Sequence, residues 1–388
     1  ESLQGFPMAA SIFENEILAA RVEDYKPSDL DTLSAAGEIV WVGVEPLGER
    51  DGRIALYLTD HLPLLHRAPH PAFGHPLPAE AGGGAGGEGS PLLDHLRTHG
   101  ASFFNQIQLS LGGFPGDLVD ALWDLVLKGA ITNDTFHALR AFTRGSKARE
   151  QRRASGFRSR RVAAPASTQG RWSLVPPPAG SDTQRANALA HQLLARYGVV
   201  TREAPALENI AGGFSAVYPL LKALEEAGRI RRGYFVAGLG ATQFASAGAV
   251  DLLRALRDEP ERPETVMLAA TDPANPYGAI VKWPESQWTL SRSVGAHVIL
   301  VNGLMACYVT RGEKQLFLFL PEDEPSRSMV ARAVAQTLAA IVQSGRRRAL
   351  LIAEINDEPA SRSPLAPFLA EEGFAATAMG YQMRAAVR

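Results

Sequence analysis

Apolar residues recur along the chain in a pattern that predicts three similar units. Each copy reads Leu-x-x-Leu-x-x-x-Gly-x-Ile. Two leucines three residues apart lie on one face of a helix, and the glycine supplies the left-handed conformation that ends a helix. The isoleucine then begins an extended segment, so each copy predicts a helix followed by a strand. The copies are Leu30, Leu33, Gly37 and Ile39; Leu122, Leu125, Gly129 and Ile131; and Leu221, Leu224, Gly228 and Ile230.

Each predicted helix is preceded by another helical segment, with a turn between the two. In the third copy the two helices are expected at residues 186–197 and 214–226. In the first copy, residues 43–52 form a turn and residues 53–58 return as a second strand. Helix, turn, helix and then a two-stranded β-hairpin is the plan of a winged helix. Three copies therefore predict tandem winged-helix modules, although any single helix-to-strand junction in an α+β protein can show this spacing.

The last third of the chain has a different pattern, with short apolar runs separated by Gly, Pro or Asn. These runs predict strands, and Asn302-Gly303 is a strong signal for a tight hairpin. A helix is expected over residues 326–342 because its apolar positions fall on one face. We interpret this region as a small β-barrel-like domain with one packed helix. The expected strands are residues 266–270, 296–301, 305–309, 315–320, 349–355 and 380–385.

Two stretches without hydrophobic periodicity read as linkers, one rich in Pro and Gly and the other basic with a Pro triplet. The resulting fold class is α+β. The expected domains are a winged helix at 1–65, a Pro/Gly linker at 66–90, a winged helix at 91–143, a basic Pro-containing linker at 144–181, a winged helix at 182–260 and the β-barrel-like domain at 261–388.

Composition narrows the class of protein. The 388 residues are 46% hydrophobic and 21% charged, which is typical of globular domains. Cys307 is the single cysteine, which excludes an internal disulfide framework and favours a reducing, cytoplasmic location. No apolar run approaches the roughly 20 residues that cross a bilayer, so no membrane partner is expected. The first residue is Glu1 rather than Met, which favours a piece of a longer chain.

Positive charge is concentrated in one stretch, although the net charge is −2. Residues 140–161 carry nine basic side chains and one acid, Glu150, for a net charge of +8. Such a density gains affinity for nucleic acid by releasing counterions, whereas the alternative is a solvated linker. The predicted nucleic-acid contacts are Arg144, Lys147, Arg149, Arg152, Arg153, Arg158, Arg160 and Arg161.

A second basic feature lies in the predicted wing of the third copy. Arg231 and Arg232 are adjacent on a strand and therefore point to opposite faces. We expect one of them to contact nucleic acid and the other to pair with Glu225 or Glu226. An aromatic side chain next to them would stack on a base of a single strand. The predicted contacts of this wing are Arg229, Arg231, Arg232 and Tyr234.

Catalytic motifs are weak. The chain lacks a Gly-x-x-x-x-Gly-Lys-Ser/Thr loop, so no nucleotide hydrolysis is expected in it. Asp134 and Asp272 are catalytic candidates, because a turn carboxylate near Phe136 or Tyr277 would stabilise an oxocarbenium ion beside a stacked base. The alternative is that such carboxylates cap their own backbone, which also applies to Asp357.

Two further pairs of polar residues favour structural roles. His95 and His99 are four residues apart on a predicted helix but have no cysteine cluster nearby, so surface histidines are favoured over a metal site. The side-chain amides of Gln106 and Gln108 could recognise a damaged base through hydrogen bonds. Both residues fall outside the apolar stripe of their helix, so we favour the alternative that they belong to its polar face.

Longer stretches resemble a known family. Residues 38–43 with 51–57, 122–125, 129–136 and 171–172 are similar to the Lhr (large helicase-related) family downstream of its helicase core. The most specific stretches are Arg-Tyr-Gly-Val-Val-Thr-Arg-Glu at 196–203, Gly-Gly-Phe-Ser-Ala-Val-Tyr-Pro at 212–219, residues 231–245 and Thr-Asp-Pro-Ala-Asn-Pro-Tyr-Gly at 271–278.

The resemblance implies a C-terminal region of a superfamily 2 DNA helicase involved in DNA repair. It implies several winged helices with a β-barrel, a homotetramer, and a likeness to AlkZ-type DNA glycosylases. Those enzymes bear a Gln-x-Gln or Gln-x-Asp element that we expect just after the first winged helix. Val40-Trp41-Val42 stands there in this chain, and Gln106-Ile107-Gln108 matches the letters elsewhere.

Three functions remain open at this point. The first is a nucleic-acid-binding and self-associating module for single-stranded or structured DNA, with RNA:DNA hybrids as a further substrate. The second is a DNA glycosylase for uracil or a damaged base, and the third is a tetramerisation scaffold that never touches DNA. No cofactor is expected in this region, because ATP and Mg²⁺ would serve only the helicase core of the same polypeptide.

Overall fold

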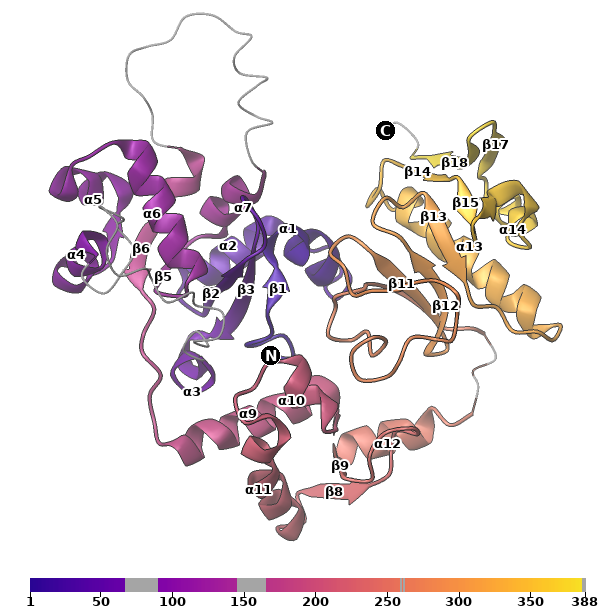
Figure 1. Cartoon of the computed structure of the whole chain (residues 1–388), viewed down its shortest axis with the longest axis horizontal. Coiled ribbons are helices and arrows are strands. Elements are labelled where there is room, and N and C mark those ends of the chain that lie inside the picture. The colour runs from indigo at the N-terminus through magenta and orange to yellow at the C-terminus, as the bar shows by residue number, and fades with distance from the viewer. Residues whose placement is uncertain (67–89, 145–164, 259, 261, 386–388) are drawn as a thin grey trace, which may run out of the picture. The chain divides into compact units, whose positions relative to one another are not determined.

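A computed structural model describes residues 1–66, 90–144, 165–258, 260 and 262–385 (Figure 1). The chain divides into two compact units, Glu1–Arg196 with Ala211–Ala223 and Tyr197–Ile210 with Leu224–Arg388. The first two copies of the repeat lie in the first unit. The elements of the third copy are divided between both units, and the β-rich domain lies in the second.

The same topology occurs three times. Each copy forms a three-stranded sheet in which its third strand lies between the first and the second, in the orders β1-β3-β2, β4-β6-β5 and β7-β9-β8. The first copy comprises β1 (Met8–Ala9), α1 (Ala10–Ile12), η1 (Phe13–Leu18), α2 (Pro27–Ala35), β2 (Ile39–Pro46) and β3 (Gly52–Leu58), followed by η2 (Thr59–His61) and α3 (Leu62–Leu65). The predicted tandem winged helices are confirmed by this recurrence.

The second and third copies repeat this order with longer helices. The second comprises α4 (Pro91–His99), β4 (Ser102–Phe103), α5 (Phe104–Leu111), α6 (Pro115–Leu127), β5 (Ile131–Asn133), α7 (Phe136–Arg144), η3 (Ala166–Thr168) and β6 (Arg171–Leu174). The third comprises α9 (Asp182–Tyr197), β7 (Val199–Val200), α10 (Glu203–Leu207), α11 (Gly213–Glu226), β8 (Ile230–Gly233), β9 (Gln243–Ser246) and α12 (Ala247–Ala255).

The repeated glycine ends the helix in every copy, as predicted. Gly37, Gly129 and Gly228 have φ angles of 75°, 70° and 71°, which glycine adopts without a steric penalty. In each copy the N–H of the residue after the glycine donates to the carbonyl of the repeat's second leucine. This six-to-one bond is the Schellman motif, and it explains why Leu and Gly recur at a constant spacing.

The boundary expected at residue 143 is wrong. β6 pairs with both β4 and β5, so the second winged helix extends through Leu174 and the segment expected as a linker at 144–181 contains one of its strands. The basic run therefore stands in the sequence between the two strands of this wing. The hairpin was missed because 37 residues, 134–170, separate its two strands, whereas an ordinary hairpin has a short turn.

The first two winged helices share one core. Trp41 of β2 stacks on Trp123 of α6 with 6.3 Å between ring centroids, and it also contacts Phe136 at 6.0 Å. The hydroxyl of Thr132 donates to the Trp41 carbonyl at 2.5 Å. Gly43 lies against α6 so closely that a Cβ there would stand 2.0 Å from the Val126 carbonyl oxygen. The strands of the first wing therefore pack against α6 at Gly43, whereas its loop at residues 48–50 is exposed.

The C-terminal domain contains two sheets. The larger has the order β10-β11-β12-β13-β15-β16, and the smaller has the order β14-β18-β17. The elements are β10 (Thr265–Ala269), β11 (His297–Val301), β12 (Leu304–Val309), β13 (Gln315–Leu318), α13 (Ser326–Gln343), β14 (Ala349–Ile352), β15 (Glu354–Ile355), β16 (Glu358–Pro359), η4 (Ala360–Arg362), α14 (Ala366–Glu371), β17 (Ala375–Thr377) and β18 (Gly380–Arg384).

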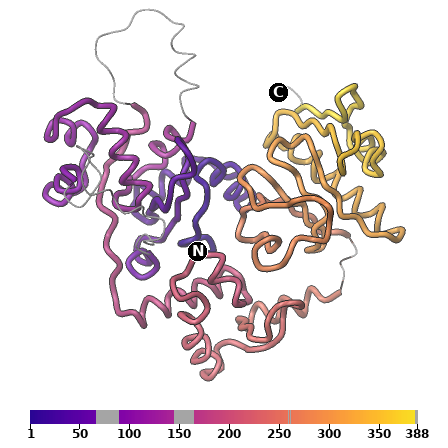
Figure 2. The backbone as a smooth tube through the Cα atoms, in the orientation of Figure 1, coloured from indigo at the N-terminus to yellow at the C-terminus, as the bar shows by residue number. Residues whose placement is uncertain are grey.

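The predicted barrel closure is not found. Within the described residues no strand pairing joins β10 to β16, so the larger sheet is open. Its strands are apolar on both faces because both faces are covered. Ile299 and Cys307 pack against α13, whereas Val298 and Tyr308 pack under the long connection between β10 and β11, traced in Figure 2. Continuous apolar runs are typical of strands buried on both faces, and closure is not needed to explain them.

Candidate nucleic-acid interface

The wing of the third winged helix presents unpaired positive charge. β8 is an edge strand, and its Arg231 and Arg232 are both exposed. In the part of the chain that the structure describes, neither arginine forms an ion pair. The predicted pairing with Glu225 or Glu226 is therefore wrong. Both arginine side chains reach solvent here, so neither needs a carboxylate.

A buried glutamine holds the loop of this wing. The Gln243 side chain is fully buried, and its Oε1 accepts from the N–H groups of Phe235 and Val236, both at 2.8 Å. Its Nε2 donates to the carbonyls of Val236 and Gly240, both at 3.0 Å. An amide can form four such bonds, and all four are made here. Sequence reasoning missed Gln243, because a glutamine at the start of a strand carries no signal by itself.

Tyr234 and Arg202 extend the basic surface of the wing. Tyr234 is 61% exposed, and its hydroxyl oxygen accepts from the Gly238 N–H at 2.9 Å, which fixes the ring on the loop. Arg202 is exposed, and its Cδ lies 3.8 Å from the position of a Cβ built on Gly240. Arg229 is also exposed just before β8. All four predicted wing residues therefore lie on β8 or next to it, and Arg202 is an addition that the sequence did not indicate.

The second helix of each helix-turn-helix differs in charge between the copies. In a nucleic-acid complex this helix lies in the groove, so its outward side chains face phosphates. α2 carries Asp29 and Asp31, and α6 carries three aspartates, whereas α11 has no carboxylate until Glu225 in its last turn. The third copy is therefore the one whose helix and wing are both compatible with a polyanion.

The basic run is only partly described. Arg144 is the exposed last residue of α7. Lys147, Arg149, Arg152, Arg153, Arg158, Arg160 and Arg161 lie outside the described residues.

Arg140 does not belong to an exposed basic surface. Its Nε donates to Glu14 at 2.6 Å and its Nη1 to Asp31 at 2.7 Å, and the side chain is only 12% exposed. Burial alone would lower the pKa of Arg140, but its hydrogen bonds and its attraction to Glu14 and Asp31 raise it overall. Counting Arg140 in the nucleic-acid-binding run was wrong, because this arginine joins the first winged helix to α7.

Asp134 is tied to the strand opposite it. Its Oδ1 accepts from the Arg171 backbone N–H and its Oδ2 from Arg171 Nε, both at 2.7 Å. These bonds link the turn after β5 to β6, which is a structural role. Phe136 beside it is fully buried, so the expected stacking of a base on that ring is wrong.

Asp272 is fully buried in the loop after β10. Its Oδ1 accepts from the Ala274 N–H at 2.7 Å, as an aspartate capping its own turn does. Arg292 donates to the backbone carbonyls of Asp272, Asn275 and Tyr277, and burial lowers the pKa of this arginine. The two candidate carboxylates thus lie in different units, and each is engaged by its own neighbours.

The other polar candidates have structural partners. Gln106 Oε1 accepts from the Phe103 N–H at 2.9 Å and so caps α5. His95 is buried, so the prediction of two surface histidines is wrong for this residue, and its ring stacks on that of His99 with centroids 4.3 Å apart. Asp357 accepts from the Trp288 indole at 2.6 Å. Gln106 and Asp357 thus form structural hydrogen bonds.

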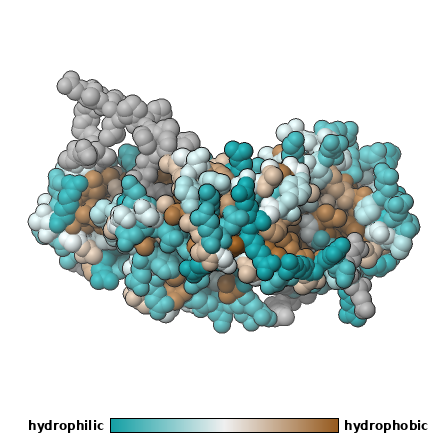
Figure 3. Space-filling view, turned by 90° about the horizontal axis from the view of Figure 1, so that it is seen from below, coloured by the Kyte–Doolittle hydropathy of each residue, from teal (hydrophilic) through white to brown (hydrophobic). Residues whose placement is uncertain are grey.

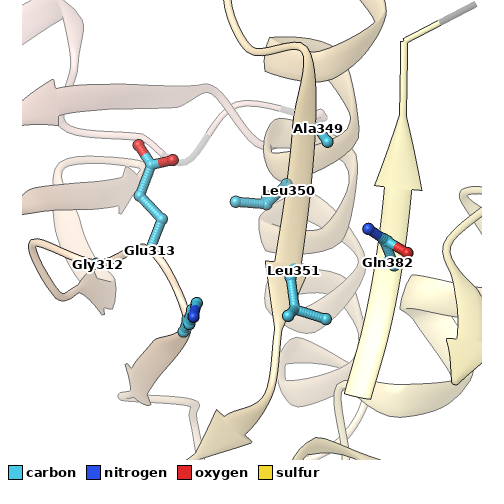
Figure 4. A pocket seen from close by; sticks show the side chains of 7 residues that line it. Gly312, Glu313, Ala349, Leu350, Leu351 and Gln382 are labelled. Carbon is cyan, nitrogen blue, oxygen red and sulfur yellow. The ribbon is translucent and has the colours of Figure 1, made fainter. Parts of the chain in front are cut away.

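A small cavity beside β14 carries no catalytic pair. It has a volume of about 210 Å³ and lies between the Gly312–Lys314 turn and β14. Figure 4 shows Glu313 on the turn to one side of β14 and Gln382 on β18 to the other. Glu313 accepts from Arg347 Nε at 2.8 Å. None of the predicted site residues lines this cavity.

The described helices include none that is long and apolar enough to cross a membrane.

Comparison with known proteins identifies two of the three winged helices. Two family models described as "Large helicase-related protein, winged-helix domain" match the chain, one for the third such domain at residues 1–59 and one for the fourth at residues 179–265. The second copy lies between these regions and is assigned from its strand order.

Two curated proteins are similar over nearly the whole chain. One is the "Lhr helicase/ probable uracil glycosylase" of Mycolicibacterium smegmatis, 37% identical over 411 residues that cover 99% of this chain and 26% of the relative. The other is the "Lhr helicase/uracil glycosylase" of Escherichia coli, 35% identical over 405 residues that cover 98% of this chain and 25% of the relative. The chain thus spans about a quarter of the length of these relatives.

Proposed function

We propose that this chain binds nucleic acid through its third winged helix. The chain belongs to the Lhr (large helicase-related) family and corresponds to a C-terminal region of its helicases. One observation carries the proposal. Of the three copies, the third combines a helix without carboxylates in its first turns with an exposed wing whose arginines have no ion-pair partner among the described residues.

The substrate proposed is a single strand or a structured DNA with an unpaired region, and an RNA:DNA hybrid is a further candidate. Tyr234 supports this preference, because an exposed ring held by its hydroxyl offers a face to an unpaired base. Stacking of this kind contributes about 1–3 kcal/mol per base and tolerates any sequence. The arginines around it would contact phosphates and supply affinity without sequence preference.

Binding is tested with a fluorescent oligonucleotide and the whole chain over a series of salt concentrations. We expect log K to fall linearly with log salt, with a slope of about 0.7 for each phosphate contact to a single strand. Alanine in place of Arg152, Arg153, Arg158, Arg160 and Arg161 is expected to flatten this slope for every sequence alike. An unchanged slope in that variant would show that the basic run is a solvated linker, and an absence of binding by the parent would refute the proposal.

Self-association is also part of the proposal, with a homotetramer as the expected state. Several winged helices of modest size leave apolar faces that can pack on neighbours, and large exposed residues such as Leu252 of α12 and Leu256 just after it are present. Light scattering at micromolar concentration is expected to give a mass above the 41.6 kDa of one chain. A mass of one chain would contradict self-association.

The helicase core, with its ATP and Mg²⁺, is proposed as a partner in the same polypeptide.

Base excision is the second candidate function, and the names of both relatives support it. In this alternative, Asp134 or Asp272 would stabilise the sugar cation formed as the base leaves. Their hydrogen bonds weigh against direct participation unless the loops open.

The test uses a uracil-containing strand and the variants Asp134→Asn and Asp272→Asn. If either carboxylate is catalytic, its variant keeps the fold and loses base release. If the parent releases uracil and both variants release it equally well, the catalytic assignment fails while base excision stands.

A further inference from the structure

The second winged helix has an outward face that repels nucleic acid. Asp117, Asp120 and Asp124 follow one another at spacings of three and four on α6, so they share one helix face, and all three are exposed. Asp124 pairs with Lys128 at 2.6 Å, whereas Asp117 and Asp120 have no ion-pair partner in the described part of the chain. A groove-facing helix with this face would set carboxylates against phosphates.

The corner in front of this helix is strongly apolar. Leu109, in the last turn of α5, is 87% exposed, and Phe114, immediately before α6, is 80% exposed. They flank the Gly112-Gly113 turn, where φ angles of 68° and 83° reverse the chain tightly. The two exposed side chains thus precede and follow the turn of this helix-turn-helix, which we call its corner. Phe103, at the start of α5, is also more than half exposed.

Such a corner is costly to leave in water. Hydrophobic side chains lie in patches among hydrophilic ones on the face shown in Figure 3, and single exposed apolar residues are ordinary. Leu109 and Phe114 differ because they are two of the most exposed large apolar residues described and lie at the same turn. Large aromatic and aliphatic residues at a protruding corner are typical of the anchors of protein interfaces.

We propose that this corner docks a basic segment of a partner protein that carries apolar anchor residues. The Phe114 and Leu109 side chains would bury against the partner's apolar residues, while Asp117 and Asp120 at the rim would face its lysines or arginines. Charge complementarity of this kind steers encounter and excludes acidic partners, nucleic acid among them. This corner of the second winged helix is thus a protein-docking surface, distinct from the nucleic-acid contacts proposed for the third wing and for the basic run.

The test uses the whole chain and a fluorescent 14-residue helical peptide of leucine and lysine, with leucines along one face. A second peptide has serine in place of every leucine and the same charge. Two double variants probe the corner, Leu109→Ser with Phe114→Ser and Asp117→Asn with Asp120→Asn. The matched control is Leu304→Ser with Met379→Ser, which removes two exposed apolar side chains from the C-terminal domain, 71% and 67% exposed.

We expect the leucine-lysine peptide to bind, and each corner variant to weaken binding about tenfold while the Leu304→Ser, Met379→Ser control binds like the parent. The serine peptide is expected to bind at least tenfold more weakly. Equal peptide binding by the parent, both corner variants and the control would overturn the proposal, because attraction would then be unspecific. Circular dichroism establishes that every variant keeps its helices.

Two other measurements separate the rival occupants. If the serine variant of the corner loses oligonucleotide binding, the corner is a nucleic-acid site and the proposal is wrong. If the same variant lowers the mass measured by light scattering, the occupant is a second copy of this chain and the basic partner is wrong. Unchanged oligonucleotide binding and unchanged mass support the proposal, whether or not the third wing binds nucleic acid.

Discussion

Replacing Arg202, Arg231 and Arg232 together with alanine is expected to weaken oligonucleotide binding about 100-fold at 0.1 M salt. Each contact of an arginine with a single-strand phosphate contributes about 0.7 to the slope of log K against log salt, so three lost contacts lower the slope by about 2. The arginines are exposed and have no ion-pair partner among the described residues, so their removal leaves no buried carboxylate behind. Fluorescence anisotropy over a salt series measures both quantities.

The control for this variant removes the same amount of charge elsewhere. Arg97, Arg185 and Arg332 are surface arginines that pair with Asp94, Asp182 and Glu371. Alanine at these three positions is expected to leave the salt slope within the error of the parent. If the two triple variants weaken binding equally, the effect comes from net charge and the third wing is not the contact surface.

Replacing Arg140 with methionine is expected to lower the free energy of unfolding of the first unit by about 3 kcal/mol, because removing one partner of a buried ion pair leaves the others uncompensated. Arg140 pairs with Glu14 and Asp31, so these two carboxylates would lose their positive partner in the variant while keeping their negative charges. Urea denaturation followed by circular dichroism measures the change. The last residue of the same helix is a matched control, since Arg144 is exposed and Arg144→Met should change the stability by less than about 0.5 kcal/mol.

A rescue distinguishes charge from packing in the Arg140 network. Adding Glu14→Gln and Asp31→Asn to Arg140→Met removes the uncompensated charges and should recover much of the lost stability. A stability that stays low in the triple variant would mean that the packing of the arginine stem dominates. Parent-like stability of Arg140→Met, combined with weaker oligonucleotide binding, would return Arg140 to the nucleic-acid surface.

The division of roles among the winged helices follows from what each wing contacts. The strands of the first wing pack against α6, where Gly43 leaves no room for a side chain beside Val126. The second wing has a long insertion between its strands, and the third is a short hairpin closed around Gln243. One topology therefore serves three situations, and the third wing combines exposed arginines with a second helix whose first turns carry no carboxylate.

Local sequence was sufficient for the parts of this protein whose physical cause is local. A Schellman motif favours glycine at the left-handed position that follows the end of a helix. Gly37, Gly129 and Gly228 therefore predicted three helix-to-strand junctions. The apolar runs of the last third form strands, because a run of four to six apolar residues bounded by turns has few other uses. The run at 349–355, predicted as one strand, is divided into β14 and β15, which belong to different sheets.

Tertiary structure decided what depends on residues far apart in the chain. β6 joins its sheet across the basic run, and no local signal places Arg171 opposite Asn133 and Phe103. The barrel prediction was wrong because apolar runs indicate that both faces of a strand are buried. They do not indicate which element covers each face. In the sequence, Arg140 is one more cation of a basic run. The structure shows that it donates to Glu14, which lies 126 residues earlier. Composition and spacing determine the modules, whereas long-range pairing determines which of their charges are left for a ligand.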